Sequence, residues 1–266
     1  MNDYAFFIMH YKKNIERRNY IFENFVTNDK SIRWITDYDR EQIDDSLDDL
    51  YCFNHDNWYE IVGQQLPILV AHRFGLNPNY RKTPWTPLIR RIEEIIRQNT
   101  PEKVIQEFPQ FMPRKLKTFE ISLLLKHRAA FKDIVANHYK FGIILEDDFI
   151  LKETSLTALK NLISCGITDW DFIDLAGGAE LTPREQDKEV IPGLFSMLPP
   201  RTRTTCGYMI SNRLCREITN LDPPLTAPCD WELTYFLQRF QAKAFWTMPT
   251  LINHGSEMKF YQSNNN

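Results

Sequence analysis

A short apolar run, Phe141 to Leu145 (FGIIL), leads directly into three acids, Glu146, Asp147 and Asp148. So short a run predicts a central strand buried on both faces. In an open α/β sheet, the loop at the carboxyl end of a strand faces the ligand crevice. Burying three carboxylates there is very unfavourable without a counter-charge, and Mg²⁺ or Mn²⁺ prefers oxygen ligands. The run therefore predicts an α/β fold with a metal site at this end of the strand.

Two other interpretations of the acids stay open. Runs of acids are common on solvated surfaces, and acids also favour the N-terminus of a helix, where the helix dipole is positive. Phe149 to Leu151, directly after the acids, is apolar again. This continuation favours the strand-edge interpretation over the helix.

The N-terminal part has the pattern of an α/β fold. Tyr4 to His10 predicts a buried strand, Asn14 to Val26 an amphipathic helix, and Ser31 to Thr36 a second strand. This order favours a Rossmann-type, mostly parallel central sheet flanked by helices. Later strands are expected at Asp171 to Leu175, Thr204 to Ile210 and Ala242 to Met248, and helices at Lys117 to Tyr139, Ser155 to Cys165, Asn212 to Leu221 and Trp231 to Phe240.

Residues 37–113 differ from the rest of the chain. They contain an acidic run and many prolines, with helical patterns at Trp58 to Phe74 and Leu88 to Gln98. We expect one domain, 1–266, in which 37–113 is a mostly helical insertion. It is either a lid or acceptor-side element, or a plain connecting subdomain.

Charge and cysteine content restrict the partners and the compartment. The net charge is -3, which argues against a nucleic-acid partner. The five cysteines form no C-x-x-C pair, which predicts reduced thiols in a cytoplasmic protein. No apolar run approaches the roughly 20 residues of a membrane span, and the start lacks the pattern of a signal peptide. We expect that either the protein is cytoplasmic or its targeting sequence is not included. Peripheral membrane association stays open.

An ordered set of motifs resembles glycosyltransferase family 25, which includes bacterial lipopolysaccharide and collagen galactosyltransferases. The helix around Glu120-Ile121 and His127 is similar to the helix that precedes the family's I-L-E-D-D strand, here Ile144 to Asp148. Ser122, Leu123 and Lys126 depart from the family's Gly, Cys and Ser. Three further segments are similar in order, namely Phe7 to His10 with Glu16-Arg17-Arg18, Thr205 to Ser211 (family T-x-x-Y-x-I-S), and Pro228 to Trp231.

The resemblance implies a GT-A-like fold and an inverting enzyme that transfers a hexose, galactose or glucose, from a UDP-sugar to a glycan. It implies that Asp148 ligates Mn²⁺ or Mg²⁺, that Glu146 contacts the ribose or supports the metal through water, and that Asp147 orients its neighbours. His254 fits the further, C-terminal ligand, because Gly255 permits close backbone approach. The alternative for His254 is an ordinary loop imidazole.

Inverting transfer also needs a base for the acceptor hydroxyl. Asp230 is our candidate, with Glu232 and Asp174 in reserve. The alternative is that Asp230 only caps the helix that follows.

The remaining expectations concern the two substrates. We expect donor contacts from His10, Arg17, Arg18, His127 and Gly177, and acceptor contacts from Trp231 and Tyr208. Each of these has a plain alternative: arginines on a helix are often solvated, a mid-helix histidine or a tryptophan is often core, and paired glycines often only make turns. Two rival functions also stay open, a metal-dependent phosphoester hydrolase and a non-catalytic carbohydrate-binding protein of the same fold.

Overall fold

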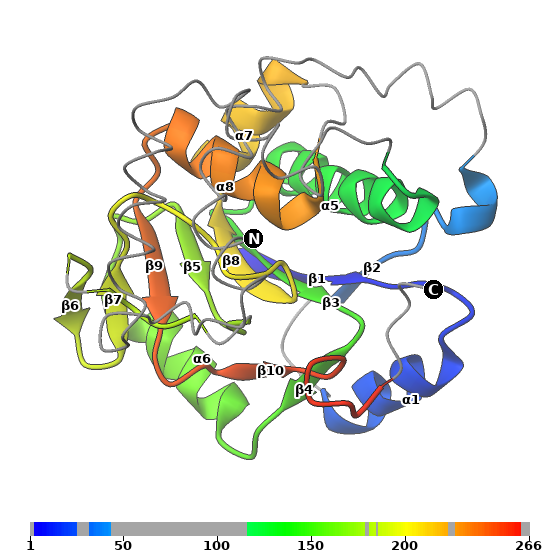
Figure 1. The fold of residues 1–266 in the computed structure, drawn as a ribbon, viewed down its shortest axis with the longest axis horizontal. Coiled ribbons are helices and arrows are strands. Elements are labelled where there is room, and N and C mark those ends of the chain that lie inside the picture. The colour runs from blue at the N-terminus through cyan, green and yellow to red at the C-terminus, as the bar shows by residue number, and fades with distance from the viewer. Residues whose placement is uncertain are drawn as a thin grey trace, which may run out of the picture.

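A mixed eight-stranded sheet forms the centre of the molecule (Figure 1). The structure, a computed structural model, describes residues 3–25, 32–43, 116–178, 181–184, 186–222 and 227–261. Within them the strand order is β2-β1-β3-β8-β5-β9-β7-β6, and β10 pairs with β4 in a second sheet. The strands are β1 (Tyr4–Met9), β2 (Ile32–Ile35), β3 (Phe141–Glu146), β4 (Phe149–Leu151), β5 (Phe172–Asp174), β6 (Lys188–Ile191), β7 (Leu194–Ser196), β8 (Gly207–Ser211), β9 (Ala244–Thr247) and β10 (Ile252–His254).

Helices cover both faces of this sheet. In Figure 1, α5, α7 and α8 lie on one face, and α1 and α6 lie on the other. The helices are α1 (Ile15–Asn24), the short 3-10 helix η1 (Arg40–Gln42), α5 (Thr118–Ala136), α6 (Ser155–Ser164), α7 (Asn212–Leu221) and α8 (Cys229–Arg239). The predicted helices and strands in the described ranges are confirmed, with ends that differ by one to three residues in most cases.

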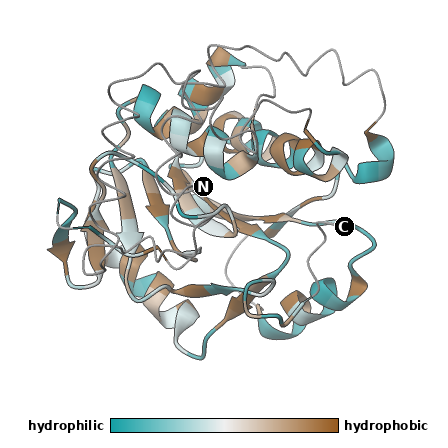
Figure 2. Cartoon of the chain, viewed as in Figure 1, coloured by the Kyte–Doolittle hydropathy of each residue, from teal (hydrophilic) through white to brown (hydrophobic). Residues whose placement is uncertain are grey.

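The core lies on both sides of the sheet because strand side chains alternate between its faces. Phe6 and Ile8 of β1 belong to the cluster that includes Ile21 of α1. Phe7 points the other way and belongs to the cluster that includes Phe131 of α5. Figure 2 shows the apolar residues along the central strands and the hydrophilic ones mainly on the outer surfaces of the helices. The expectation that FGIIL is a central strand buried on both faces is confirmed.

The sheet is mixed, so the expected mostly parallel arrangement is found in only part of it. β1 runs parallel to both β2 and β3, and β5 runs parallel to β9. β8 runs antiparallel to both β3 and β5, and the hairpin β6–β7 adds antiparallel pairs at the edge. The reversal arises because the chain enters β8 at the carboxyl end of β3, through residues 197–206, instead of through a crossover helix.

The small sheet of β4 and β10 was not predicted as such. Each strand has three residues, too few to show a period, and about 100 positions separate them in the sequence. The register places His254 opposite Phe149, the residue that follows the acidic run. This pairing brings the C-terminal segment to the acids.

Most of the predicted insertion, residues 44–113, lies outside the described residues. Its described beginning, 37–43, contains η1 and contacts α5. Among the described helices, none combines the length and apolar character needed to cross a bilayer.

Candidate active site

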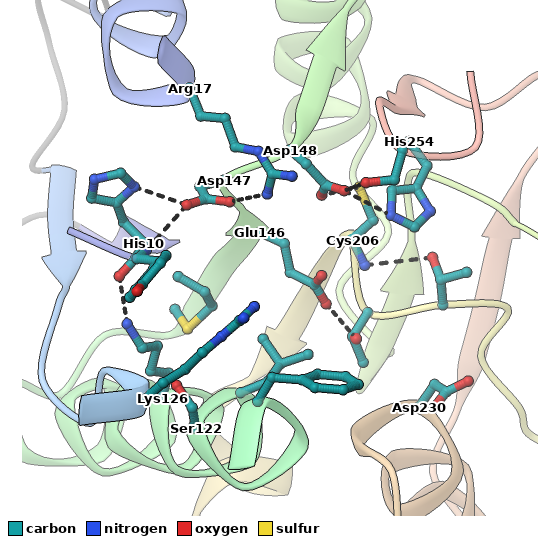
Figure 3. Close-up of a pocket in the computed structure, with 18 residues that line it drawn as sticks. His10, Arg17, Ser122, Lys126, Glu146, Asp147, Asp148, Cys206, Asp230 and His254 are labelled. Carbon is teal, nitrogen blue, oxygen red and sulfur yellow. Dashed lines mark hydrogen bonds and ion pairs between the residues drawn. The ribbon is translucent and has the colours of Figure 1, made fainter. Parts of the chain in front are cut away.

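A cavity of about 330 Å³ opens at the carboxyl ends of β1 and β3. Figure 3 shows its wall, which is assembled from segments far apart in the sequence. The lining residues are Met9, His10, Tyr11, Arg17, Arg40, Phe119, Ser122, Leu123, Lys126, Glu146, Asp147, Asp148, Thr204, Thr205, Cys206, Asp230, His254 and Ser256. The acidic run thus lines a cavity at a strand end, as predicted.

The carboxylate of Asp147 is occupied by the protein itself. It accepts hydrogen bonds from His10 Nδ1 at 2.9 Å, Tyr11 N at 3.1 Å, Asn14 Nδ2 at 3.2 Å and Arg17 Nη1 at 2.7 Å. Burial by itself would raise the pKa of this carboxyl, but the His10 hydrogen bond and the Arg17 charge outweigh it and lower the pKa. Three of these donors bond Oδ2, and Arg17 bonds Oδ1. Asp147 therefore orients Arg17 and His10.

Asp148 lies in a different environment, beside the C-terminal segment. Its Oδ2 is 3.0 Å from His254 Nε2 and accepts the Ser256 hydroxyl at 2.5 Å. The Gly255 amide donates to the Asp148 carbonyl at 2.8 Å, and a Cβ on Gly255 would lie 2.5 Å from that oxygen. The expected close approach at this glycine is confirmed, and it is what brings His254 to Asp148.

Asp148, His254 and Cys206 together form a candidate metal site. One ligand atom from each lies within 4.8 Å of the other two. The carboxylate oxygen, imidazole nitrogen and thiol sulfur are all ligand types that divalent metals accept. On the chemistry of these donors, the three residues fit a divalent cation.

Without a cation, His254 and Asp148 neutralise each other. Burial would lower the pKa of His254, but the Asp148 and Glu257 carboxylates outweigh it and raise that pKa to about 10. Asp148 is shifted the other way: burial would raise its pKa, but His254 lowers it. The pair is thus an imidazolium and a carboxylate in neutral solution.

Glu146 is the most exposed acid of the three in the run. It is half-buried and lines the cavity. Thr205 Oγ1 donates to its Oε1 at 2.5 Å, and the buried His127 Nε2 lies 3.7 Å from the same oxygen. His127 in turn bonds the Tyr208 hydroxyl at 2.6 Å through Nδ1. His127 therefore supports Glu146 from behind and does not line the cavity.

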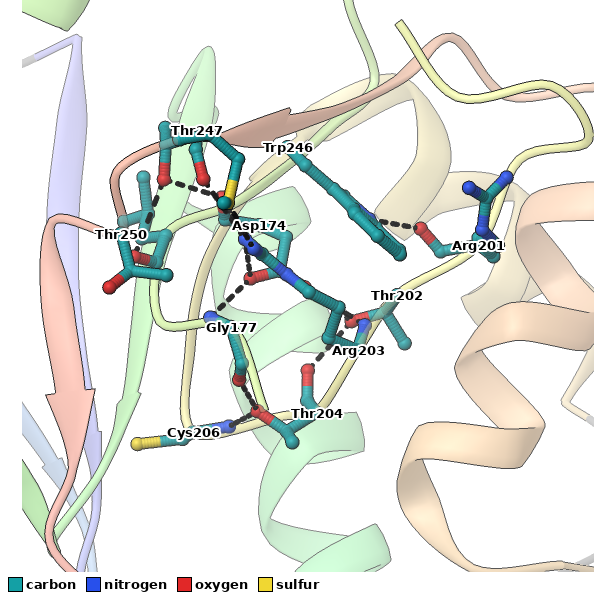
Figure 4. Close-up of polar contacts among 12 residues, drawn as sticks. Asp174, Gly177, Arg201, Thr202, Arg203, Thr204, Cys206, Trp246, Thr247 and Thr250 are labelled. Atoms are coloured by element: carbon teal, nitrogen blue, oxygen red, sulfur yellow. Dashed lines mark hydrogen bonds and ion pairs between the residues drawn. The ribbon is translucent and has the colours of Figure 1, made fainter. Parts of the chain in front are cut away.

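Residues 201–206, here called the strap, carry Thr204, Thr205 and Cys206 into the cavity wall. Figure 4 shows how the strap is tied down by Asp174 and Arg203. Asp174 accepts hydrogen bonds from the Gly177 and Arg203 amides at 2.9 Å each, and Arg203 Nη2 donates to it at 2.9 Å. Arg203 also stacks on the Trp246 ring at 4.7 Å.

Asp230 lies in the first turn of α8, across the cavity from Arg17 (Figure 3). The N-cap position belongs to Pro228, so Asp230 is not the helix cap. Burial raises the pKa of Asp230 to about 6, against the backbone amides of Asp230 and Trp231, with further raising by the charges of Glu146 and Glu120. A half-buried carboxyl with this pKa is suited to take a proton near neutral pH.

Three predicted site residues lie elsewhere. Asp174 has no exposed surface and is occupied by the strap, so it is no candidate for the base. Glu232 is buried against Arg128, at 3.0 Å, away from the cavity. Tyr208 has no exposed surface and faces His127, so no acceptor can reach it. Both acids and the tyrosine sit on predicted elements, but their side chains point into the core.

Three further candidates lie outside the cavity wall. Arg18 is exposed and stacks over Phe22 at 5.5 Å. Trp231 is partly buried against the core. Gly177 contacts the strap, because its carbonyl accepts the Thr204 hydroxyl at 2.7 Å. Arg18 and Trp231 thus lie outside the cavity wall, whereas Gly177 supports the wall from behind.

Lys126 is a wall residue that was not predicted. Its ammonium donates to the His10 carbonyl and to Asp39 Oδ1, each at 2.5 Å. Ser122, one helical turn earlier, donates to the Tyr38 carbonyl at 2.6 Å. Burial lowers the pKa of Lys126, and the pairing with Asp39 opposes that shift. The signal in the sequence was a Ser and a Lys at i and i+4 on a helix that is otherwise apolar there.

Arg40 is the other cation that was missed. Its guanidinium lies over the Tyr11 ring at 5.2 Å and the Phe119 ring at 5.7 Å. Arg17, Arg40 and Lys126 thus bring three cations to the wall that carries the acids. Nothing in the local pattern of Arg40 marked it, because η1 belongs to the stretch expected to be an insertion.

Comparison with known proteins identifies the family. The family model described as glycosyltransferase family 25 (LPS biosynthesis protein) matches residues 4–233. The chain belongs to glycosyltransferase family 25. The matched range contains Asp148 and Asp230 but ends before His254, so the place of His254 in the site rests on the β4–β10 pairing. The suspected family 25 resemblance is confirmed, and the coarse function is that of a glycosyltransferase.

No curated protein matches the chain. Among solved structures, the crystal structure of A197 from STIV is similar to it at a TM-score of 0.31 and 9% identity. That match covers 49% of this chain and 64% of A197, less than two thirds of that protein. So distant a likeness informs neither the fold nor the function of this family 25 member.

Proposed function

We propose that this family 25 protein transfers a hexose from a UDP-sugar to a glycan with inversion, using a GT-A-like site and a divalent cation. One observation carries the proposal: Asp148 with His254, and the half-buried Asp230, line the same 330 Å³ cavity. Inverting transfer needs charge stabilisation for the leaving diphosphate, which a cation held by acidic ligands can supply, and a base for the acceptor hydroxyl, which a carboxyl with a raised pKa can supply.

Asp148 and His254 would hold the cation, with Glu146 beside them to contact the ribose or a metal-bound water. Oxygen ligands favour Mn²⁺ or Mg²⁺. A cation bound there would neutralise charge that grows on the leaving diphosphate. As a ligand, His254 would have to be neutral, so it would release the proton that it shares with Asp148 to solvent.

The basic residues of the wall would bind the diphosphate oxygens. Arg17 is held in place by Asp147, and Arg40 by two aromatic rings. Guanidinium groups bind phosphate through paired hydrogen bonds, and preorganised side chains lose little entropy when they do so. This division assigns the cations of the wall to the donor and leaves Asp230 for the acceptor.

Asp230 would take the proton of the acceptor hydroxyl. With its pKa at about 6, most of the carboxyl is ionised at neutral pH yet remains a stronger base than an ordinary aspartate. The family description points to lipopolysaccharide synthesis, and we propose a glycan of that kind as the acceptor. Cytoplasmic location and peripheral membrane association stay predictions.

The test is turnover of UDP-galactose and UDP-glucose with Mn²⁺ or Mg²⁺, after a thermal-shift screen that selects the donor. Asp148→Ala is expected to abolish transfer. Asp169 is an exposed acid outside the cavity wall, so Asp169→Ala serves as the control. Wild-type turnover by Asp148→Ala would refute the site.

Further measurements address the two rival functions and the stereochemistry of transfer. A phosphoester hydrolase would cleave phosphomonoesters, and a binding protein would retain glycan affinity without turnover. The anomeric configuration of the product, read by NMR, checks inversion. An equatorial linkage in the product, formed from the axial linkage of the donor, supports it, and an axial linkage in the product contradicts it.

A further inference from the structure

Cys206 lies against the two residues proposed to hold the cation. Its side chain has no exposed surface, and its Sγ lies 3.9 Å from Asp148 Oδ1. Figure 3 shows Cys206 beside Asp148 and His254. The three ligand atoms lie within 4.8 Å of one another. They come from the turn between β3 and β4, the strap and β10, so the fold, and not the local sequence, brings them together.

The backbone holds the thiol in this place. The Cys206 carbonyl accepts the Glu146 amide at 2.9 Å, and the Cys206 amide donates to Thr204 Oγ1 at 3.4 Å. A Cβ on the next residue, Gly207, would lie 3.1 Å from Ile252 and 3.2 Å from Leu145. The start of β8, directly after Cys206, is thus packed closely between side chains of β3 and β10.

We infer that Cys206 is a third protein ligand of this cation, and that the site binds a thiophilic divalent ion such as Zn²⁺ or Co²⁺ in preference to Mg²⁺. This inference rests on the cation site of the proposed function and names its chemistry.

The three ligand atoms determine which divalent metals the site binds most tightly. Mg²⁺ requires nearly octahedral oxygen ligands and gives up water reluctantly, so a sulfur in the shell disfavours it. Thiolate and imidazole together suit Zn²⁺, and affinity for a given nitrogen, oxygen and sulfur site rises from Mn²⁺ through Co²⁺. Three protein ligands with one position open toward a cavity is the arrangement of catalytic zinc sites. Cys206 therefore shifts the preference away from the ions that oxygen ligands alone would select.

Cobalt tests this directly, because a cysteine ligand gives Co²⁺ a sulfur-to-metal charge-transfer absorption in the near ultraviolet. The full chain is freed of metal with a chelator, kept reduced with a phosphine, and titrated with Co²⁺. We expect one equivalent to produce the band, and Zn²⁺ to abolish it by displacement while a large excess of Mg²⁺ does not. Calorimetry on the same samples measures metal affinity independently of activity.

Cys206→Ala and Cys215→Ala form a matched pair. Both thiols are fully buried, but Cys215 lies in the core on α7 and not at the cavity. Cys206→Ala is expected to lose the band and to weaken Co²⁺ binding by at least about 10–100-fold, the cost of losing even an outer-shell partner. Cys215→Ala is expected to change neither. Thermal unfolding of both variants shows whether each remains folded, and Cys206→Ser provides a second variant with a smaller change of shape.

The outcomes separate this inference from the proposed function. Co²⁺ binding that Asp148→Ala abolishes, but without a charge-transfer band in the wild type, overturns the cysteine ligand and leaves the cation site standing. A band that persists in Cys206→Ala assigns the sulfur to another cysteine and also overturns it. If the wild type binds no divalent metal at all, the cation site and the cysteine ligand both fail.

Discussion

Arg203 Nη2 lies 2.9 Å from Asp174 Oδ1, and neither side chain has any exposed surface. The pair joins the end of β5 to the strap that lines the cavity (Figure 4). The Arg203 guanidinium also stacks on Trp246, whose indole N–H donates to the Arg201 carbonyl at 2.8 Å. An enclosed ion pair thus fixes the conformation of the strap, and the strap places the Thr205 hydroxyl against Glu146.

Replacing Asp174 by asparagine keeps the shape and removes the charge. Because Arg203 is left as an uncompensated buried cation, we expect the free energy of unfolding to fall by about 3–5 kcal/mol. Urea denaturation measures this loss. Asp169→Asn breaks an exposed pair with Lys243 and is expected to cost less than about 1 kcal/mol. Equal losses in the two variants would contradict the role given to the enclosed pair.

Thr205→Val removes the hydroxyl that donates to Glu146 at 2.5 Å and keeps the volume of the side chain. A hydrogen bond to a charged group contributes about 1.5–3 kcal/mol. If Glu146 must be held for the donor, kcat/KM falls about tenfold or more, whereas Thr205→Ser retains most of it. Steady-state kinetics of the three proteins give the answer. Full activity in Thr205→Val would mean that the orientation of Glu146 does not matter.

Gly177→Ala and Gly166→Ala separate backbone strain from a clash. Both glycines have positive φ, +74° and +79°, so each alanine incurs the cost of about 1–2 kcal/mol for a left-handed conformation. A Cβ on Gly177 would also lie 2.6 Å from Thr250 Cγ2, whereas nothing lies within 4 Å of one on Gly166. We expect Gly177→Ala to be the less stable variant by roughly 1–3 kcal/mol in urea denaturation. Adding Thr250→Ser, which removes that methyl group, should recover part of the difference.

The raised pKa of Asp230 predicts a pH dependence of catalysis. The proposed base must be ionised, so kcat/KM is expected to rise with pH through about 6 and then to level off. Asp230→Asn should lose most of the activity and this limb of the profile. A profile of wild type and variant at constant ionic strength checks both statements. An unchanged limb in a residually active Asp230→Asn would assign the titration to another group.

The same residue predicts a dependence of stability on pH. The folded pKa of about 6 exceeds the ordinary value of 3.8, so the folded state binds the proton more tightly than the unfolded state. This contribution is complete below pH 3.8 and is lost as the pH rises through about 6. Asp230→Asn, which never ionises, should therefore gain melting temperature relative to wild type between pH 4 and pH 6. A difference that is constant across this range would contradict the burial of Asp230.

Local sequence determined the elements and the position of the acids. FGIIL predicted a central strand because an apolar run of that length between helices is buried on both faces, and the acids then had to lie at a strand end. The helices followed from apolar spacing, which requires only near neighbours. Family membership could also be inferred from ordered motifs, and the match over residues 4–233 confirms it.

Long-range packing decided which way each side chain points. Asp174, Glu232 and Asp230 are all acids that the sequence offers as candidates for the base. Of the three, only Asp230 lines the cavity. The other two carboxylates are paired with Arg203 and Arg128. Cys206 and His254 reach Asp148 only through the return of β8 and the pairing of β10 with β4. These contacts join segments up to about 100 residues apart in the sequence. The pattern of neighbouring residues therefore cannot predict them.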